Sequence, residues 1–227
     1  MKKTVLLACD VYNPMDPVKF GEWESQETID YMQSVISSLG YEAHVIENPN
    51  TIVSYLSGLD KREKQNLIVW NLVEGYSSPN REAYIPALCE YLGICHTGSD
   101  ASTQILSLDK FRTKLVLEKN DINTSEYYLL RSSLDWKPKE YPVFVKPNLE
   151  GSSIGISEYN LIRNESEWNR KVPEILNQYS ECIAEPFFDG NDLTVAVIGN
   201  GGSYLVSPVA FVNYPGLVYS DQVKSKE

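Results

Sequence analysis

The sequence has 227 residues, of which 42% are hydrophobic and 11% aromatic, and its formal charge is -11 at pH 7. This length exceeds that of most compact domains, so we expect two packed units. The acidic charge argues against nucleic acid as a partner, because a phosphate backbone requires a basic face. No apolar run reaches the roughly 20 residues of a membrane helix, and the start is typical of a first strand rather than a signal peptide. We therefore expect no membrane partner and a cytoplasmic location.

In the first half of the chain, expected strands and helices alternate. The helix at 24–39 has apolar residues at a helical period and stops at Gly40, a common residue at helix ends. The run that begins at Leu67 is continuously apolar, which is typical of a buried parallel strand. The other expected elements are strands at 3–9, 41–46 and 94–96 and helices at 51–59 and 83–92. This alternation predicts a doubly wound parallel sheet within an α/β protein.

The second half has a different character, with short strands separated by polar turns. Helices are expected at 106–120 and 165–179. Expected strands lie at 127–130, 142–147, 182–188 and 192–198, and the glycine-rich residues 199–202 predict a hairpin turn. An α+β unit therefore begins near residue 105.

The segment from Val143 to Ser157 joins an apolar strand to a loop of small residues. The strand carries Lys146, and lysine is unusual on a buried strand. Backbone N–H groups of such a loop can approach phosphate oxygens while the lysine supplies positive charge. The alternative is a hairpin whose glycines satisfy turn geometry and whose lysine extends to solvent.

Two further segments carry charged residues at the ends of expected elements. Lys110 lies near the start of the helix at 106–120, where the helix dipole disfavours a cation; this suggests a binding partner, although a solvated helix face is the commoner explanation. Glu185 ends an apolar strand and Asp192 opens the next. These carboxylates could hold an adenine amino group and ribose hydroxyls, or they could be ordinary turn acids.

Three segments in order carry the family resemblance: residues 97–115, 144–157 and 184–199. Together they resemble the D-alanine–D-alanine ligases of the ATP-grasp superfamily, and residues 38–46 and 86–94 extend the resemblance more loosely. The resemblance implies a doubly wound pre-ATP-grasp domain followed by an α+β ATP-grasp domain that is incomplete at its C-terminus. The implied bounds are 1–104 for the first domain, 105–187 for the small lobe and 188–227 for the start of the C-terminal lobe.

The resemblance also implies a site for the ATP phosphates. Lys110 and Lys146 would contact them, and the loop that begins with Glu150, Gly151, Ser152 and Ser153 would close over them. Ser152 matches a serine that orders this loop around the substrate. Lys224 matches the lysine of the family's lid that reaches the γ-phosphate.

The nucleoside would lie along the segment at 185–192. Glu185 and the backbone of Pro186, Phe187 and Phe188 would hold adenine, and Asp192 would hold the ribose. The resemblance thus assigns ATP as the cofactor.

The substrate site departs from the family pattern. The family carries a His-Gly and an acidic glycine turn in its first domain, whereas residues 71–83 of this chain have the sequence NLVEGYSSPNREA. Glu24, near the start of the first long helix, is the carboxylate that we place at a substrate amine. The alternative is an ordinary acid at a helix start, which the dipole favours.

The implied activity joins a carboxylate to an amine through an acyl phosphate, as in peptidoglycan synthesis, with ATP and small amino acids as ligands and a homodimer formed through the first domain. The family's magnesium ligands follow the lid, so we expect them beyond residue 227 and expect this chain alone to be inactive. Two alternatives stay open. One is a non-catalytic nucleotide-binding protein, and the other is an ATP-grasp ligase for a different amino acid or natural-product substrate.

Overall fold

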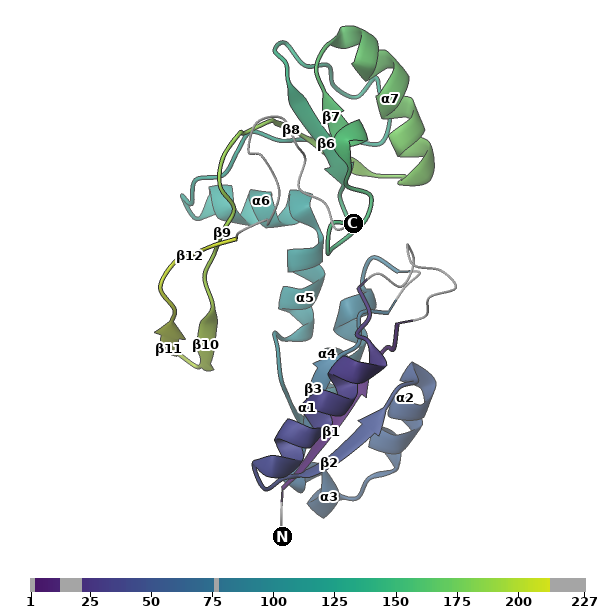
Figure 1. Cartoon of the computed structure of the whole chain (residues 1–227), viewed down its shortest axis with the longest axis vertical. Coiled ribbons are helices and arrows are strands. Elements are labelled where there is room, and N and C mark those ends of the chain that lie inside the picture. Colours follow the sequence, from purple (N-terminus) through teal and green to yellow (C-terminus); the bar gives the residue numbers. More distant parts are fainter. Residues whose placement is uncertain (1–2, 13–21, 76–77, 213–227) are drawn as a thin grey trace.

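A computed structural model of the chain describes residues 3–12, 22–75 and 78–212. Two sheet-containing regions lie one above the other, and α5 (Ala101–Leu108) runs between them (Figure 1). One sheet is parallel and the other antiparallel, so the α/β class expected from the sequence is confirmed. None of the helices in the described ranges is long and apolar enough to span a membrane.

The first region contains a four-stranded parallel sheet in the order β2-β1-β3-β4. Its strands are β1 (Thr4–Cys9), β2 (Glu42–Ile46), β3 (Leu67–Leu72) and β4 (Cys95–His96). Its helices are α1 (Gln26–Ser38), α2 (Pro49–Gly58), α3 (Lys61–Asn66) and α4 (Tyr84–Leu92), with a single 3-10 turn at Arg81–Ala83.

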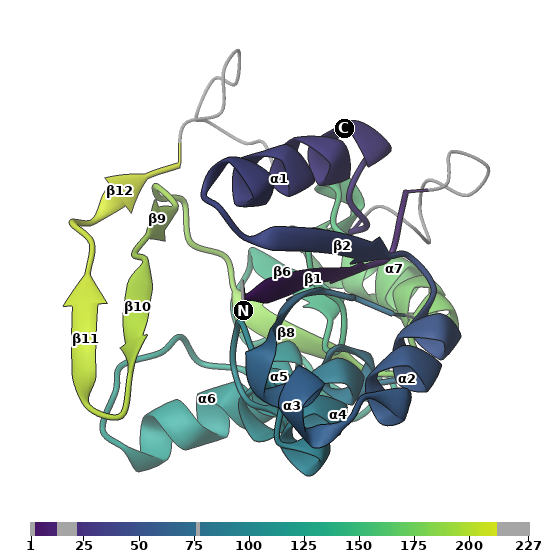
Figure 2. The same ribbon diagram turned by 90° about the horizontal axis from the view of Figure 1, so that it is seen from below.

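Successive residues of β1 point to opposite faces of this sheet, as strand geometry requires. Val5 and Leu7 pack against Ile36 of α1, whereas Leu6 and Ala8 belong to a cluster with apolar residues of α2 and α4. Figure 2 shows α1 on one side of β1 and β2, with α2 and α4 on the other. Helices on both faces confirm the doubly wound prediction.

The short helix α3 was not expected from the sequence, because its charged residues show no apolar period. It forms through a capping box. The Asp60 carboxylate accepts the backbone N–H of Glu63 at 2.8 Å, and the Glu63 carboxylate accepts that of Asp60 at 2.7 Å. These two bonds satisfy donors that a helix start otherwise leaves free.

The single helix expected at 106–120 is wrong, because the structure has two helices there. They are α5 and α6 (Lys110–Lys119). Asp109 separates them with φ -82° and ψ 96°, and its carboxylate accepts the backbone N–H of Arg112 at 2.9 Å. An aspartate that bonds to nearby backbone competes with helix continuation and favours a new helix start.

The second region contains an antiparallel sheet in the order β5-β8-β6-β7. Its elements are β5 (Tyr128–Leu130), β6 (Val143–Pro147), β7 (Leu161–Ile162), α7 (Glu165–Gln178) and β8 (Cys182–Pro186), with a 3-10 turn at Glu158–Asn160. Val143, Val145 and Ala184 pack with Trp168 and Val172 of α7. The opposite face of β6 and β8 is therefore free to carry polar side chains.

Beyond β8 the chain forms short, exposed strands. They are β9 (Leu193–Thr194), β10 (Val197–Asn200), β11 (Ser203–Val206) and β12 (Ala210–Phe211). The hairpin turn is confirmed, since Asn200 pairs with Ser203 and the intervening Gly201 and Gly202 have φ values of 56° and 93°. The single strand expected at 192–198 is wrong, because β9 and β10 belong to different ladders.

Candidate functional site

The antiparallel register brings Lys146 of β6 next to Glu185 of β8. Phe144 lies opposite Glu185, and Lys146, two residues later, shares the Phe144 face, so Lys146 and Glu185 are diagonal neighbours across the two strands. Lys146 Nζ forms an ion pair with Glu185 Oε2, and the two side chains are 26% and 10% exposed. A lysine on this strand is thus explained by a carboxylate partner on the next one.

A second lysine, Lys114 of α6, reaches the same carboxylate. Its Nζ lies 2.6 Å from Glu185 Oε1 and 2.7 Å from both Thr124 Oγ1 and Ser125 Oγ. Ser125 Oγ donates to Glu185 Oε1 at 3.1 Å. Burial raises the pKa of Glu185, but Lys146 and Lys114 outweigh burial, so this pKa lies below its usual range.

Asn148 fixes the start of α6 against the end of β6. Its side chain is fully buried and donates from Nδ2 to Asp109 Oδ1 at 3.0 Å and to Glu181 Oε1 at 2.8 Å. Its Oδ1 accepts the backbone N–H of Phe111 at 2.8 Å. A buried amide with these partners fixes geometry, and it sets Lys110, the first residue of α6, beside the loop that follows β6.

Lys110 extends into this loop. Its Nζ donates to the carbonyl oxygen of Glu150 and, at 3.5 Å, to that of Asn148. Burial, together with the nearby charge of Lys146, lowers the pKa of Lys110 to about 8. Two lysines from separate elements therefore lie close enough to repel each other. Such a pair is an energetic cost that a bound polyanion would relieve.

The loop at 148–155 has an unusual backbone conformation. Ser152 and Ser153 have φ values of 45° and 65°, in a region that non-glycine residues rarely adopt. A Cβ added to Gly155 would lie 2.7 Å from Pro147 and Tyr179, and one added to Gly151 would lie 2.5 Å from Glu22 Oε1. Close packing thus holds the loop in a conformation that costs energy locally, a feature common at ligand-binding loops.

Arg81 joins this loop to the first region. Its guanidinium lies 3.2 Å from Glu22 Oε2 and 3.3 Å from Glu150 Oε2, and it donates to the Leu149 carbonyl at 3.0 Å. The side chains of Arg81 and Glu22 are each 6% exposed. One buried arginine therefore connects residues far apart in the sequence at the boundary between the two sheets.

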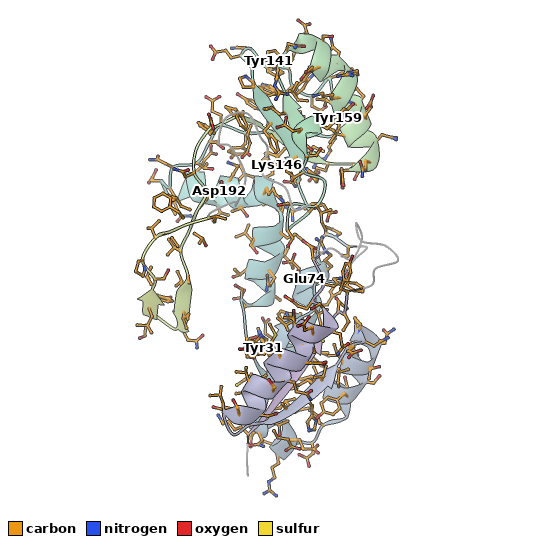
Figure 3. The ribbon with its side chains drawn as sticks, viewed as in Figure 1. Tyr31, Glu74, Tyr141, Lys146, Tyr159 and Asp192 are labelled. Atoms are coloured by element: carbon orange, nitrogen blue, oxygen red, sulfur yellow. The ribbon has the colours of Figure 1, made fainter. Side chains whose placement is uncertain are left out.

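Further carboxylates lie at the carboxyl ends of the parallel strands, the edge where such sheets usually bind ligands. Asp10 follows β1 and accepts the backbone N–H of Gly75 at 2.8 Å. Burial, with the nearby charges of Glu82 and Glu22, raises the pKa of Glu74 to about 7. Figure 3 shows Glu74 at the upper end of the first region and Lys146 in the second region above it.

The structure brings together five of the residues singled out from the sequence: Lys110, Lys146, Glu150, Gly151 and Glu185. The two predicted loop serines lie in the same loop. Their roles toward a ligand stay predictions.

The nucleoside residues follow Glu185 along the chain. Pro186 ends β8 opposite Val143, and the Phe187 N–H donates to the Pro142 carbonyl at 3.1 Å. Phe188 is 69% exposed. Asp192 is exposed, and its carbonyl accepts the N–H of Val212 at 2.9 Å.

Two predicted residues stand apart from this group. Lys224 lies outside the described residues. Glu24 pairs through its backbone with Val11 and accepts the N–H of Tyr12 at 2.8 Å. It is Glu22, two residues earlier, whose carboxylate reaches the loop.

Sequence reasoning missed four residues of this site: Glu22, Arg81, Lys114 and Asn148. Arg81 lies in the segment that departs from the family pattern, and this departure was the available signal. Asn148 lies within the segment from Val143 to Ser157 but carries no local pattern that predicts burial. Nothing in the sequence distinguishes Lys114 from an ordinary solvated lysine.

Comparisons with known proteins identify relatives of this chain. The family model described as the D-ala D-ala ligase C-terminus matches residues 115–227. The chain belongs to the D-alanine–D-alanine ligase-like ATP-grasp proteins. It is 26% identical over 178 residues to the D-alanine–D-alanine ligase of Thermotoga petrophila, covering 78% of this chain and 55% of that protein. It is 31% identical over 144 residues to that of Ralstonia nicotianae, covering 62% and 43%.

Solved ligase structures share the fold. The D-alanine–D-alanine ligase of Helicobacter pylori aligns with a TM-score of 0.63 and 18% identity, covering 95% of this chain and 76% of that one. The Bacillus anthracis ligase complexed with ATP aligns with a TM-score of 0.66 and 16% identity, covering 99% and 71%. The chain spans about half the length of the curated relatives it matches.

Magnesium does not fit the part of the chain that the structure describes. No group of three or more histidine, cysteine, aspartate or glutamate side chains in those ranges is arranged to hold a metal ion. The acids that lie closest to the loop are instead engaged by Arg81. We therefore assign no contact of this site to a metal.

Proposed function

We propose that this chain binds ATP as part of a cytoplasmic carboxylate–amine ligase of the D-alanine–D-alanine type. The observation that carries the proposal is the convergence of Lys110 and Lys146, from separate elements, beside the loop at 148–155. Two ammonium groups and a small-residue loop suit the oxygens of a triphosphate. One related structure, the Bacillus anthracis ligase, is complexed with ATP.

In this proposal the nucleotide lies along β8 and the phosphates lie against β6 and α6. Glu185 and the backbone from Pro186 to Phe188 hold adenine, and Asp192 holds the ribose. Lys110 and Lys146 bind phosphate oxygens under the loop, and Lys224 reaches the γ-phosphate. These residues contribute by binding and orienting groups rather than by forming bonds themselves.

The proposed reaction has two steps. A substrate carboxylate attacks the γ-phosphorus, which forms an acyl phosphate and releases ADP. The amine of a second amino acid then attacks the acyl carbon, and inorganic phosphate leaves as the amide bond forms. Ser152 orders the loop around the first substrate, and Glu24 binds a substrate amine.

Nucleotide binding by this chain can be measured by titration calorimetry with ATP. K110M and K146M each remove a charge-assisted contact of about 1.5–3 kcal/mol, so we expect the Kd to rise about tenfold or more in each variant. K139M, at an exposed lysine, is the matched control and should leave the Kd unchanged. Equal Kd values in all four proteins would contradict the proposal.

The assay for the proposed ligation is ADP release that requires a pair of amino acids. D-Alanine is the first substrate to test. Arg81, in the segment that departs from the family pattern, supports a different amino acid as the second candidate, because it sets a cation beside Glu22 and Glu150. ADP release with another amino acid but not with D-alanine would favour that second candidate.

The homodimer is a separate proposal. Light scattering coupled to size-exclusion chromatography reports the mass of the particle in solution. A mass equal to one chain across the concentrations used for binding would exclude the dimer without affecting the nucleotide proposal.

A further inference from the structure

We propose that Lys114 is a positioning residue that keeps the Glu185 carboxylate ionised when Lys146 leaves it to bind nucleotide phosphates. This inference rests on the proposed ATP binding. In the structure, Glu185 has an ammonium group on each of its oxygens, with Lys146 on Oε2 and Lys114 on Oε1. A carboxylate with two counterions can release one and still remain paired.

Lys114 is the partner that the protein holds in place. An ammonium group has three donors, and those of Lys114 have three close acceptors: Thr124 Oγ1 at 2.7 Å, Ser125 Oγ at 2.7 Å and Glu185 Oε1 at 2.6 Å. Its side chain is 13% exposed. The surrounding hydroxyls therefore fix its position independently of any ligand.

Lys146 is the partner that can move. Its side chain is 26% exposed, twice the value for Lys114. It lies on β6 two residues before Asn148, the first residue of the loop at 148–155, and its charge lowers the pKa of Lys110. A phosphate bound between the two lysines would attract Lys146 away from Glu185.

Without a counterion, the ionised form of the buried Glu185 carboxylate would be destabilised once Lys146 moves away. Its side chain is 10% exposed, and a desolvated carboxylate without a counterion takes up a proton. The charged groups that face it are Lys146 from β6 and Lys114 from α6. The nearby Tyr127 contributes a ring that lies 5.4 Å from Lys114 Nζ, and its hydroxyl is bonded to Glu118.

Removing Lys114 should therefore couple ATP binding to protonation. In K114M, Lys146 is the remaining counterion of Glu185, and its transfer to phosphate leaves the carboxylate unpaired. The carboxylate then binds a proton near neutral pH, so the K114M complex forms with uptake of up to about one proton. In the wild type, Lys114 stays in place and this uptake does not occur.

The experiment is calorimetric titration of the full chain with ATP, at about pH 6 and about pH 8, in buffers of different ionisation enthalpy. The dependence of the observed heat on the buffer enthalpy gives the protons taken up. We expect the proton uptake of K114M to exceed that of the wild type by close to one proton at the lower pH. We also expect the Kd of K114M to be about tenfold larger at the higher pH than at the lower. Protonation of ATP itself cancels in the difference.

Three matched measurements separate positioning from a merely structural role. K114R restores the cation and should return proton uptake to the wild-type value. The double variant K114M/E185Q lacks the titrating carboxylate and should show no excess uptake. Adenosine lacks the phosphates that draw Lys146 away, so its binding to K114M should also show none.

The possible failures are distinguishable. Absence of ATP binding by the wild type would overturn the proposed function. ATP binding by the wild type, with the same proton uptake in K114M, would overturn this inference alone. If K114M does not fold, as judged by circular dichroism, K114Q offers Thr124 and Ser125 a polar partner without the charge and is titrated in its place.

Discussion

At the residue scale, the site depends on charges that the fold holds at a cost. Lys110 is the clearest case, because burial and the nearby Lys146 both disfavour its protonated form. Its Nζ is bonded to the carbonyl oxygens of Glu150 and Asn148, which partly replace water. A ligand with negative charge would complete that replacement, so the lysine is arranged for binding more than for stability.

The lowered pKa of Lys110 predicts a pH dependence. The protonated form binds phosphate, and it is lost as the pH rises through about 8. We expect the Kd for ATP to increase above this pH by up to about tenfold per pH unit. K110R, whose guanidinium stays charged, should show a flat profile over the same range. The measurement is the Kd from titrations across the pH series.

The lowered pKa of Lys110 also determines how its contribution to the free energy of unfolding changes with pH. Unfolded lysine has a pKa of 10.5 and folded Lys110 one of about 8, so between these values the unfolded chain binds more protons. The contribution of Lys110 to the free energy of unfolding therefore rises with pH across this window. If ATP affinity falls across this window while the free energy of unfolding rises, the loss of binding comes from Lys110 and not from general alkaline unfolding.

At the element scale, the loop at 148–155 holds strain in its two serines. Left-handed backbone costs a non-glycine residue about 1–2 kcal/mol, and glycine removes that cost. We expect S153G to raise the free energy of unfolding in urea by about 0.5–1 kcal/mol, reduced by the greater freedom of glycine when unfolded. S153A keeps the Cβ and should show no gain. A gain in both variants would assign the effect to the lost hydroxyl.

The break between α5 and α6 shows how an element boundary can escape sequence reasoning. Apolar periodicity continues across Leu106 to Asn120, so the pattern predicts one helix. Asp109 ends that helix because its carboxylate bonds both to the Arg112 N–H and to the Asn148 amide. The second of these bonds comes from Asn148, which follows a strand distant in sequence, and no local pattern predicts it.

At the scale of the whole molecule, Arg81 connects the two regions. Its side chain is buried and bonds to Glu22, Leu149 and Glu150, so the loop beside the two lysines is positioned partly from the first region. Figure 1 shows the two regions one above the other, with α5 running between them. Loop geometry, and with it nucleotide affinity, should therefore respond to changes in the first region.

Removal of Arg81 tests this connection. R81M leaves the Glu22 carboxylate buried without its partner, which we expect to lower the free energy of unfolding by about 3–5 kcal/mol. R81M/E22M replaces both partners with apolar groups and should recover much of the loss. R62M, at an exposed arginine, is the control. The measurement is urea unfolding. If R81M is as stable as the wild type, Arg81 does not stabilise the contact between the two regions.

Local sequence patterns were enough to predict the α/β class and most of the strands and helices, although they did not predict α3, the break at Asp109 or the break between β9 and β10. Alternating strands and helices, the apolar run at Leu67 and the glycine-rich turn at 199–202 are local patterns, and local patterns decide where regular structure forms. The three family segments likewise predicted Lys110, Lys146 and Glu185 as residues of the site.

How these residues meet depends on the packing of elements that lie far apart in the sequence. The pairing of Lys114 with Glu185, the bonds of Asn148 to Asp109, and the contact of Arg81 with Glu150 join residues from different elements. Burial gives these contacts their energy, because a charge or amide removed from water must find a specific partner. Which partner it finds depends on how sheets and helices pack, and spacing along the chain carries no record of that packing.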